Sequence, residues 1–151
     1  MELHMENLKS ALLGGNHSLV VRNDQCAGRG NLGPHVWAYD GRGIADLMTL
    51  LKTHPEQLKG ASLADKVVGK AAAALMIEGG ATEVYAHMIS KAALALFSTH
   101  PEISVTYGTV VDHIINHDHT GWCPMEQLCH QIATASECVA AIELKLKQLK
   151  K

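Results

Sequence analysis

Three charged residues lie where a short predicted strand, "GASLAD", runs into an alanine-rich helix. Asp65 ends the strand, and Lys66 and Lys70 follow at a spacing that places both on one exposed stripe of the predicted helix 66–78. One interpretation is a capping carboxylate and a solvated helix face. The other is a ligand site, because open α/β sheets bind ligands at the carboxyl ends of their strands. We expect these charges to cap the helix and also to line a cleft.

The sequence "DGRG", Asp40 to Gly43, forms a second corner of this kind. It follows the predicted strand "HVWAY", leads into the predicted helix "GIADLMTLLKTH", and has two glycines that let a ligand approach the backbone. Arg42 would project near the N-terminus of that helix. It is either part of a simple turn or a side chain that binds an anion.

Cys123 is a candidate nucleophile. It precedes Pro124, and proline is favoured at the first position of a helix, so Cys123 falls at or beside the N-cap. The positive end of the helix stabilises a thiolate there. The alternative is a buried, inert thiol, since free cysteines are usually buried. We expect the other three cysteines to be packing residues: Cys26, Cys129 and Cys138.

Several segments resemble cofactor motifs, but none keeps the required context. "GRGNLG", residues 28–33, matches a dinucleotide pattern, yet a proline and a strand follow where a helix should begin. Gly69-Lys70 lacks the first glycine and the Ser or Thr of a phosphate-binding loop. A possible set of zinc ligands consists of His113, His117, His119 and Cys123. The spacing of these residues matches no compact zinc motif. We therefore predict no cofactor and no metal.

The composition excludes several classes of protein. The 151 residues are 47% hydrophobic and 19% charged, which is typical of one globular domain, here residues 1–151. A formal net charge of -2 with scattered lysines and arginines indicates no nucleic-acid partner. The longest apolar run, 71–77, is too short to span a membrane. The cysteines form no C-x-x-C pair and the N-terminus resembles no export signal, so we expect a cytoplasmic protein with reduced thiols.

Hydrophobic periodicity predicts alternating strands and helices. The predicted strands are "SLVVRN", "HVWAY", "GASLAD", "EVYAHMI" and "ISVTY". The predicted helices are a first one ending at Gly14-Gly15, then 43–54, 66–78, 90–100, 123–132 and about 136–149, the last capped by Ser136. This order predicts an α/β fold, a three-layer α-β-α sandwich around a mixed sheet of about five strands.

Three segments together resemble a known family: "DGRGIADLMTLL", "LADKVVGKAAAALM" with "EVYAHMIS", and "TGWCPMEQL". They are similar to the uncharacterised bacterial family called domain of unknown function 1893, over about residues 8–132. The resemblance implies a fold like that of the cytidine deaminases. Those enzymes bind zinc through H-x-E and P-C-x-x-C at the starts of two helices, with a Glu as general acid/base. The corresponding segments here, 42–44 and 65–69, contain no His, Glu or Cys, so we expect no zinc-dependent deamination.

The resemblance also implies which residues occupy the former zinc cleft. Asp65, Lys66 and Cys123 would be the catalytic residues. The expected ligand-binding residues are Arg42, Gly43, Lys70, Ser90, Asn116 and Glu126.

Three functions fit this pattern. The first is binding of a small anionic or nucleotide-like ligand in the former zinc cleft. The second is a zinc-independent enzyme with Cys123 as nucleophile and Asp65 or Lys66 assisting proton transfer. The third is a structural or regulatory subunit that docks through its C-terminal helix. Because deaminase-like folds commonly associate, a homodimer is the expected assembly.

Overall fold

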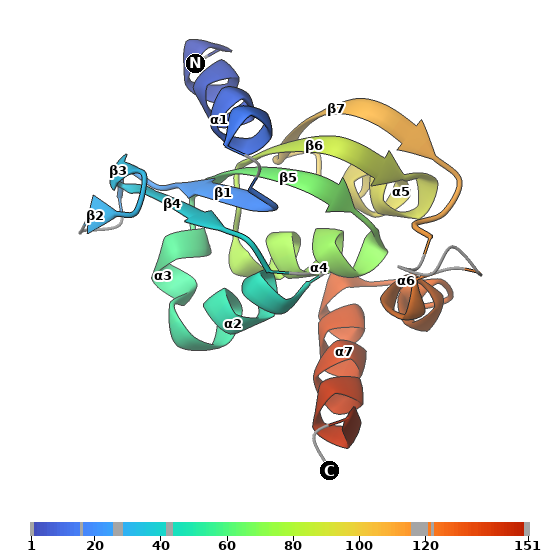
Figure 1. The fold of residues 1–151 in the computed structure, drawn as a ribbon. Helices are drawn as coiled ribbons and strands as arrows, with labels where there is room; N and C mark the ends of the chain where they lie inside the picture. The colour runs from blue at the N-terminus through green and yellow to red at the C-terminus, as the bar shows by residue number, and fades with distance from the viewer. Residues whose placement is uncertain are drawn as a thin grey trace.

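A five-stranded sheet with the strand order β4-β1-β5-β6-β7 forms the centre of the fold (Figure 1). The computed structural model describes residues 2–15, 17–25, 29–41, 44–115, 121 and 123–149. The strands of this sheet are β1 (Leu19–Arg22), β4 (Val36–Tyr39), β5 (Ser62–Val68), β6 (Glu83–Ser90) and β7 (Ser104–Val111). β1 is antiparallel to both of its neighbours, whereas β5, β6 and β7 are parallel. The predicted mixed sheet of about five strands is confirmed.

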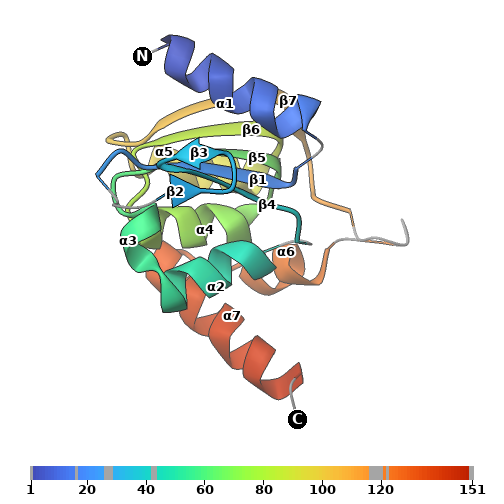
Figure 2. The ribbon, with the colours of Figure 1, turned by 60° about the vertical axis from the view of Figure 1, so that its left-hand side comes forward.

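Helices lie on both faces of the sheet, as Figure 1 and Figure 2 show. On one face, α1 (Glu2–Gly14) packs across β1 and β5. On the other face, α4 (Lys70–Gly79) is central. The helices that pack around α4 are α2 (Ala45–Thr53), α3 (Pro55–Leu58), α5 (Lys91–Ser98), α6 (Pro124–Cys129) and α7 (Ala135–Leu149). A small hairpin of β2 (Arg29–Gly30) and β3 (Gly33–Pro34) lies between β1 and β4 in the chain.

The alanine-rich sequence of α4 explains its central position. Every residue from Ala71 to Met76 is at most 3% exposed. The small side chains let this helix approach both the sheet and the surrounding helices closely. The helix ends at Gly80, whose φ of 86° is a left-handed conformation that glycine adopts at little cost.

The two faces of the sheet carry separate hydrophobic cores. The larger core lies on the α4 side and includes Leu63, Val84 and Ile89 from the strands. On the opposite face, Leu8 and Leu12 of α1 contribute to a smaller core. α1 therefore gives the sheet a second covered face, mainly over β1 and β5 and at Tyr85 of β6.

The junction between β5 and α4 differs from the sequence prediction. The strand continues through Asp65 and Lys66 to Val68. Gly69 is the N-cap of α4, and Lys70 is the first residue of the helix. The β-branched end of the strand outweighs the helical spacing of the two lysines. The expected cap at Asp65 is therefore wrong, and Lys66 and Lys70 do not share a helix face.

Other boundaries also differ from the prediction. β7 continues to Val111, because Thr109, Val110 and Val111 are again β-branched. α6 ends at Cys129, earlier than expected. Thr134 rather than Ser136 caps α7: the N–H of Glu137 donates to Thr134 Oγ1 at 3.2 Å, and that hydroxyl donates to Glu137 Oε1 at 2.9 Å.

Candidate functional site

A pocket of about 550 Å³ lies at the carboxyl end of β5. Its polar lining residues are Ser18, Asp65, Lys66, Cys123 and Glu126. The rest of the described wall is apolar or backbone, from Ile44, Val67, Gly69, Ala71, Ala72, Ile114, Ile115, Pro124 and Met125. A mostly apolar pocket with a few polar groups, in this size range, is typical of a small-molecule site.

Asp65 is a buried carboxyl group in the wall of this pocket, with 7% of its surface exposed. Burial raises the pKa of Asp65 to about 8. Hydrogen bonds from the backbone N–H groups of Val67 and Lys66 act in the opposite direction and lower the pKa, but by less. The nearby carboxylate of Asp46 raises the pKa further. Near neutral pH, Asp65 is therefore mostly an uncharged acid that can both donate and accept a hydrogen bond.

Glu126 has a positioning role that the sequence did not reveal. It is 2% exposed and accepts the backbone N–H of Lys70 at Oε1 and that of Ile114 at Oε2, both at 2.9 Å. The hydroxyl of Ser90 also donates to Oε1, at 3.4 Å. This one carboxylate thereby joins the start of α4, the end of β6 and the segment after β7 around the pocket floor.

Lys70 and Ser90 are not among the residues that line this pocket. The ammonium group of Lys70 donates to the backbone carbonyl oxygens of His130, at 3.3 Å, and Ile132. Ser90 is the N-cap of α5 and accepts the N–H of Ala93 at 3.1 Å. Both residues were predicted to bind ligand, and in the structure each makes hydrogen bonds within the protein.

Cys123 lines the pocket and is half-buried. It is the N-cap residue of α6, as predicted from the following proline, and its own N–H donates to the carbonyl oxygen of Ile114 at 2.8 Å. Cys129 and Cys138 are buried, and burial raises the pKa of Cys129 to about 12. They are packing residues, as predicted.

Lys66 is the only cation among the described residues that line the pocket. It belongs to β5, and its backbone N–H donates to the carbonyl oxygen of Ser18 at 3.0 Å. Its side chain is partly exposed. Lys66 thus lines the pocket as the residue that follows the buried acid on the same strand.

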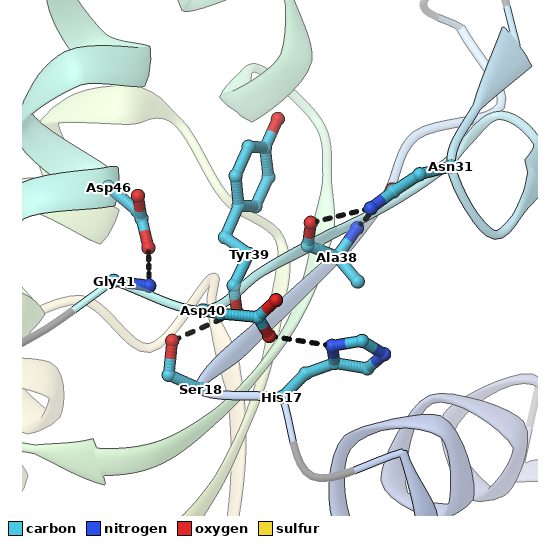
Figure 3. Close-up of polar contacts among 8 residues, drawn as sticks. All are labelled: His17, Ser18, Asn31, Ala38, Tyr39, Asp40, Gly41 and Asp46. Carbon is cyan, nitrogen blue, oxygen red and sulfur yellow. Dashed lines mark hydrogen bonds and ion pairs between the residues drawn. The ribbon is translucent and has the colours of Figure 1, made fainter.

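Ser18 connects the pocket to the neighbouring strand β4 (Figure 3). Its hydroxyl donates to the carbonyl oxygen of Tyr39 at 2.9 Å, while His17 Nδ1 contacts Asp40 Oδ1 at 2.7 Å. The side chains of His17 and Ser18 point away from each other (Figure 3). Although a serine, a histidine and an aspartate are close, they do not form a catalytic triad, because the histidine does not face the hydroxyl.

Asp46, in the first turn of α2, holds the chain that leaves β4 (Figure 3). Its Oδ2 accepts the backbone N–H of Gly41 at 2.7 Å. Asp46 is also the acidic neighbour that raises the pKa of Asp65. Asp46, which sequence reasoning had not selected, thus links the "DGRG" corner to the electrostatics of Asp65.

Several predicted residues lie outside the described part of the chain, namely Arg42, Gly43, Asn116, His117 and His119. Cys26 also lies outside it. Within the described residues, no three His, Cys, Asp or Glu side chains are grouped in a way that could hold a metal ion.

The apolar lining was also missing from the sequence prediction. Ile114 and Ile115 lie in the pocket wall, within the segment "HIINHDH" whose histidines drew attention as possible ligands. Only the folded chain brings these two residues into the same pocket as β5. Their distance from Asp65 in the sequence left no local signal.

The sequence profile of the domain of unknown function DUF1893 matches residues 18–146. The chain belongs to the DUF1893 family. A crystal structure of a DUF1893 family protein from Thermotoga maritima has a similar fold, with a TM-score of 0.79 and 23% sequence identity. The match covers 93% of this chain and 88% of the Thermotoga chain. No curated protein matches this sequence.

The family assignment confirms the resemblance carried by the three sequence segments, and the shared fold covers nearly the whole chain. In the residues that the structure describes, no helix has the length and apolar character needed to cross a membrane.

Proposed function

We propose that the pocket beside Asp65 binds a small nucleotide-like molecule, with a flat, largely apolar body and an anionic group directed toward Lys66. The buried Asp65 in an otherwise apolar wall is the observation that carries this proposal. Burying a carboxyl group costs free energy unless it is satisfied, and such groups concentrate at functional sites.

The composition of the wall supports the class of ligand. Apolar side chains from α4, α6 and the segment after β7 provide surfaces for an aromatic or aliphatic body. An uncharged Asp65 offers one donor and one acceptor to a polar edge of the ligand. Lys66 supplies the charge for a phosphate or carboxylate at the rim.

The element order also supports a cytidine-deaminase-like fold for this domain. α1 precedes two antiparallel strands of the central sheet, β1 and β4, and alternating helices and parallel strands follow. In that fold the ligand would lie at the starts of α2 and α4. This agrees with the place of the pocket, which Ile44 and Gly69 line beside those helix starts.

A ligand-observed NMR screen tests the proposal. The panel contains nitrogen heterocycles with and without a phosphate or carboxylate group, and hits are titrated into the wild-type protein and three variants. Asp65→Asn keeps an uncharged donor and acceptor, so it should retain binding, whereas Asp65→Ala should weaken it at least tenfold. Asp24→Asn, on an exposed carboxylate, serves as the matched control. Hits that bind Asp65→Ala as tightly as the wild type would contradict the proposal.

A second candidate is a zinc-independent enzyme that uses Cys123 as nucleophile. The observation that favours it is the presence of Cys123, Asp65 and Lys66 in one pocket. An acid with a pKa of about 8 exchanges protons near neutral pH, which suits a general acid or base. Incubating each binding hit with the protein, and following product by mass spectrometry, tests it. Turnover that persists in Cys123→Ser would contradict this role.

A further inference from the structure

The last strand of the sheet, β7, is unusually open to solvent for a strand of eight residues. It lies at one edge, after β6, and no further strand among the described residues pairs with it (Figure 1). Six of its residues are exposed and only Val105 and Val111 are partly buried. α1 packs on β1 and β5 instead of covering β7.

This edge lacks the features that usually prevent strand pairing. From Ser104 to Val111 the sequence is "SVTYGTVV", which contains no charged residue and no proline. Tyr107 and Val110 are 47% and 37% exposed. Alternate residues of an edge strand direct their N–H and C=O groups away from the sheet, so β7 offers a ready template for another strand.

We propose that β7 pairs antiparallel with β7 of a second copy of this chain, so that the two central sheets become continuous across a two-fold axis. Antiparallel pairing follows from symmetry, since a two-fold axis perpendicular to the sheet reverses the direction of the partner strand. The exposed Tyr107 and Val110 become partly covered in the pair.

The charges at the ends of β7 favour a second copy as the occupant. Before the strand, His100 Nδ1 contacts Glu102 Oε2 at 3.3 Å, and at its far end Lys91 contacts Asp112 at 2.7 Å. In an antiparallel pair, the Ser104 end of β7 in one copy lies beside the Val111 end of β7 in the other. Each end therefore meets a basic and an acidic group, and no block of like charge faces another across the axis.

Sedimentation velocity on the full chain tests this pairing. The wild type should sediment as a dimer that dissociates on dilution. The double variant Thr106→Lys/Thr109→Lys places like charges in the middle of the paired edge, so it should be monomeric. The matched control Thr49→Lys/Thr53→Lys makes the same changes on exposed positions of α2 and should remain dimeric. Circular dichroism establishes that each variant is folded.

Hydrogen exchange on the wild type provides a second readout that requires no variant. Amides of residues 104–111 should exchange more slowly as the protein concentration rises, while those of α7 should not change. A wild type that is monomeric at its highest soluble concentration would overturn the proposal. This holds even if β7 pairs with a strand of a different protein. A dimer with unchanged exchange in β7 would also overturn it.

Discussion

The backbone N–H of Lys70, the first residue of α4, donates to Oε1 of Glu126 at 2.9 Å, although the two residues lie far apart in the sequence. The other oxygen of the same carboxylate accepts the N–H of Ile114 at 2.9 Å. A buried carboxylate that satisfies two backbone donors is expensive to replace, because charge-assisted hydrogen bonds are stronger than neutral ones. Glu126 therefore fixes the floor of the pocket without having to contact a ligand.

Glu126→Gln should lower the free energy of unfolding by about 1.5–3 kcal/mol, because an amide can accept only one of the two backbone N–H groups through oxygen. Urea denaturation followed by circular dichroism measures the change. Glu78→Gln, on the exposed face of α4, is the matched control and should change stability little. Equal stability of Glu126→Gln and the wild type would show that these two hydrogen bonds contribute nothing net.

Asp65 should make the protein less stable as the pH rises. Its pKa is raised from 3.8 to about 8 in the folded state, so between these values the folded state holds a proton that the unfolded state has lost. The free energy of unfolding should therefore fall across this window, by at most about 1.4 kcal/mol per pH unit, and level off above pH 8. Below pH 4 both states are protonated and the effect disappears.

Comparing the wild type with Asp65→Asn isolates this contribution. The difference in unfolding free energy between the two proteins should change with pH through the same window, with Asp65→Asn becoming the relatively more stable protein. Asp24→Asn removes an exposed carboxylate and should show no comparable trend. A difference that is independent of pH would mean that Asp65 keeps an ordinary pKa in the folded protein.

Lys70→Met should destabilise the protein without changing ligand affinity. Its ammonium group ties α4 to the backbone carbonyl oxygens of His130 and Ile132, and the side chain does not line the pocket. We expect a loss of about 1–3 kcal/mol in the free energy of unfolding. Lys52→Met, on the exposed surface of α2, provides the control. If Lys70→Met is fully folded in the assay and still loses ligand binding, the result would instead support Lys70 as a ligand-binding residue.

Much of the fold could be predicted from local patterns. The strands around Val20 and Ala38 and the helix that ends at Gly80 have strong propensities and clear stop signals. The end of β5 could not be predicted, because Lys66 and Lys70 have a spacing that also suits a helix. Asp65 was correctly placed in the strand, but the continuation of β5 beyond it to Val68 was not predicted.

The site was predictable only in part, for a related reason. Cys123 was placed correctly by the proline that follows it, which is a local signal. The buried role of Glu126 depends on backbone groups of Lys70 and Ile114, which lie in distant segments. A surface carboxylate and a buried one look the same in a sequence.

Ligand binding should slow the alkylation of Cys123. This half-buried thiol lines the pocket, so a bound molecule should shield it from iodoacetamide. Peptide mass spectrometry locates the label and separates Cys123 from the other cysteines. The buried Cys129 and Cys138 should stay unlabelled in the folded protein with or without ligand. An alkylation rate that a saturating hit leaves unchanged would place that hit elsewhere on the protein.

The pH dependence of ligand affinity tests the central claim most directly. Isothermal titration of the best NMR hit, at pH values from about 6 to about 10, compares the wild type with Asp65→Asn. If the ligand binds to the uncharged acid, the wild-type affinity should be flat at low pH and fall about tenfold per pH unit above 8, while Asp65→Asn shows no such fall. A wild-type affinity that follows the same pH profile as that of Asp65→Asn would contradict the account.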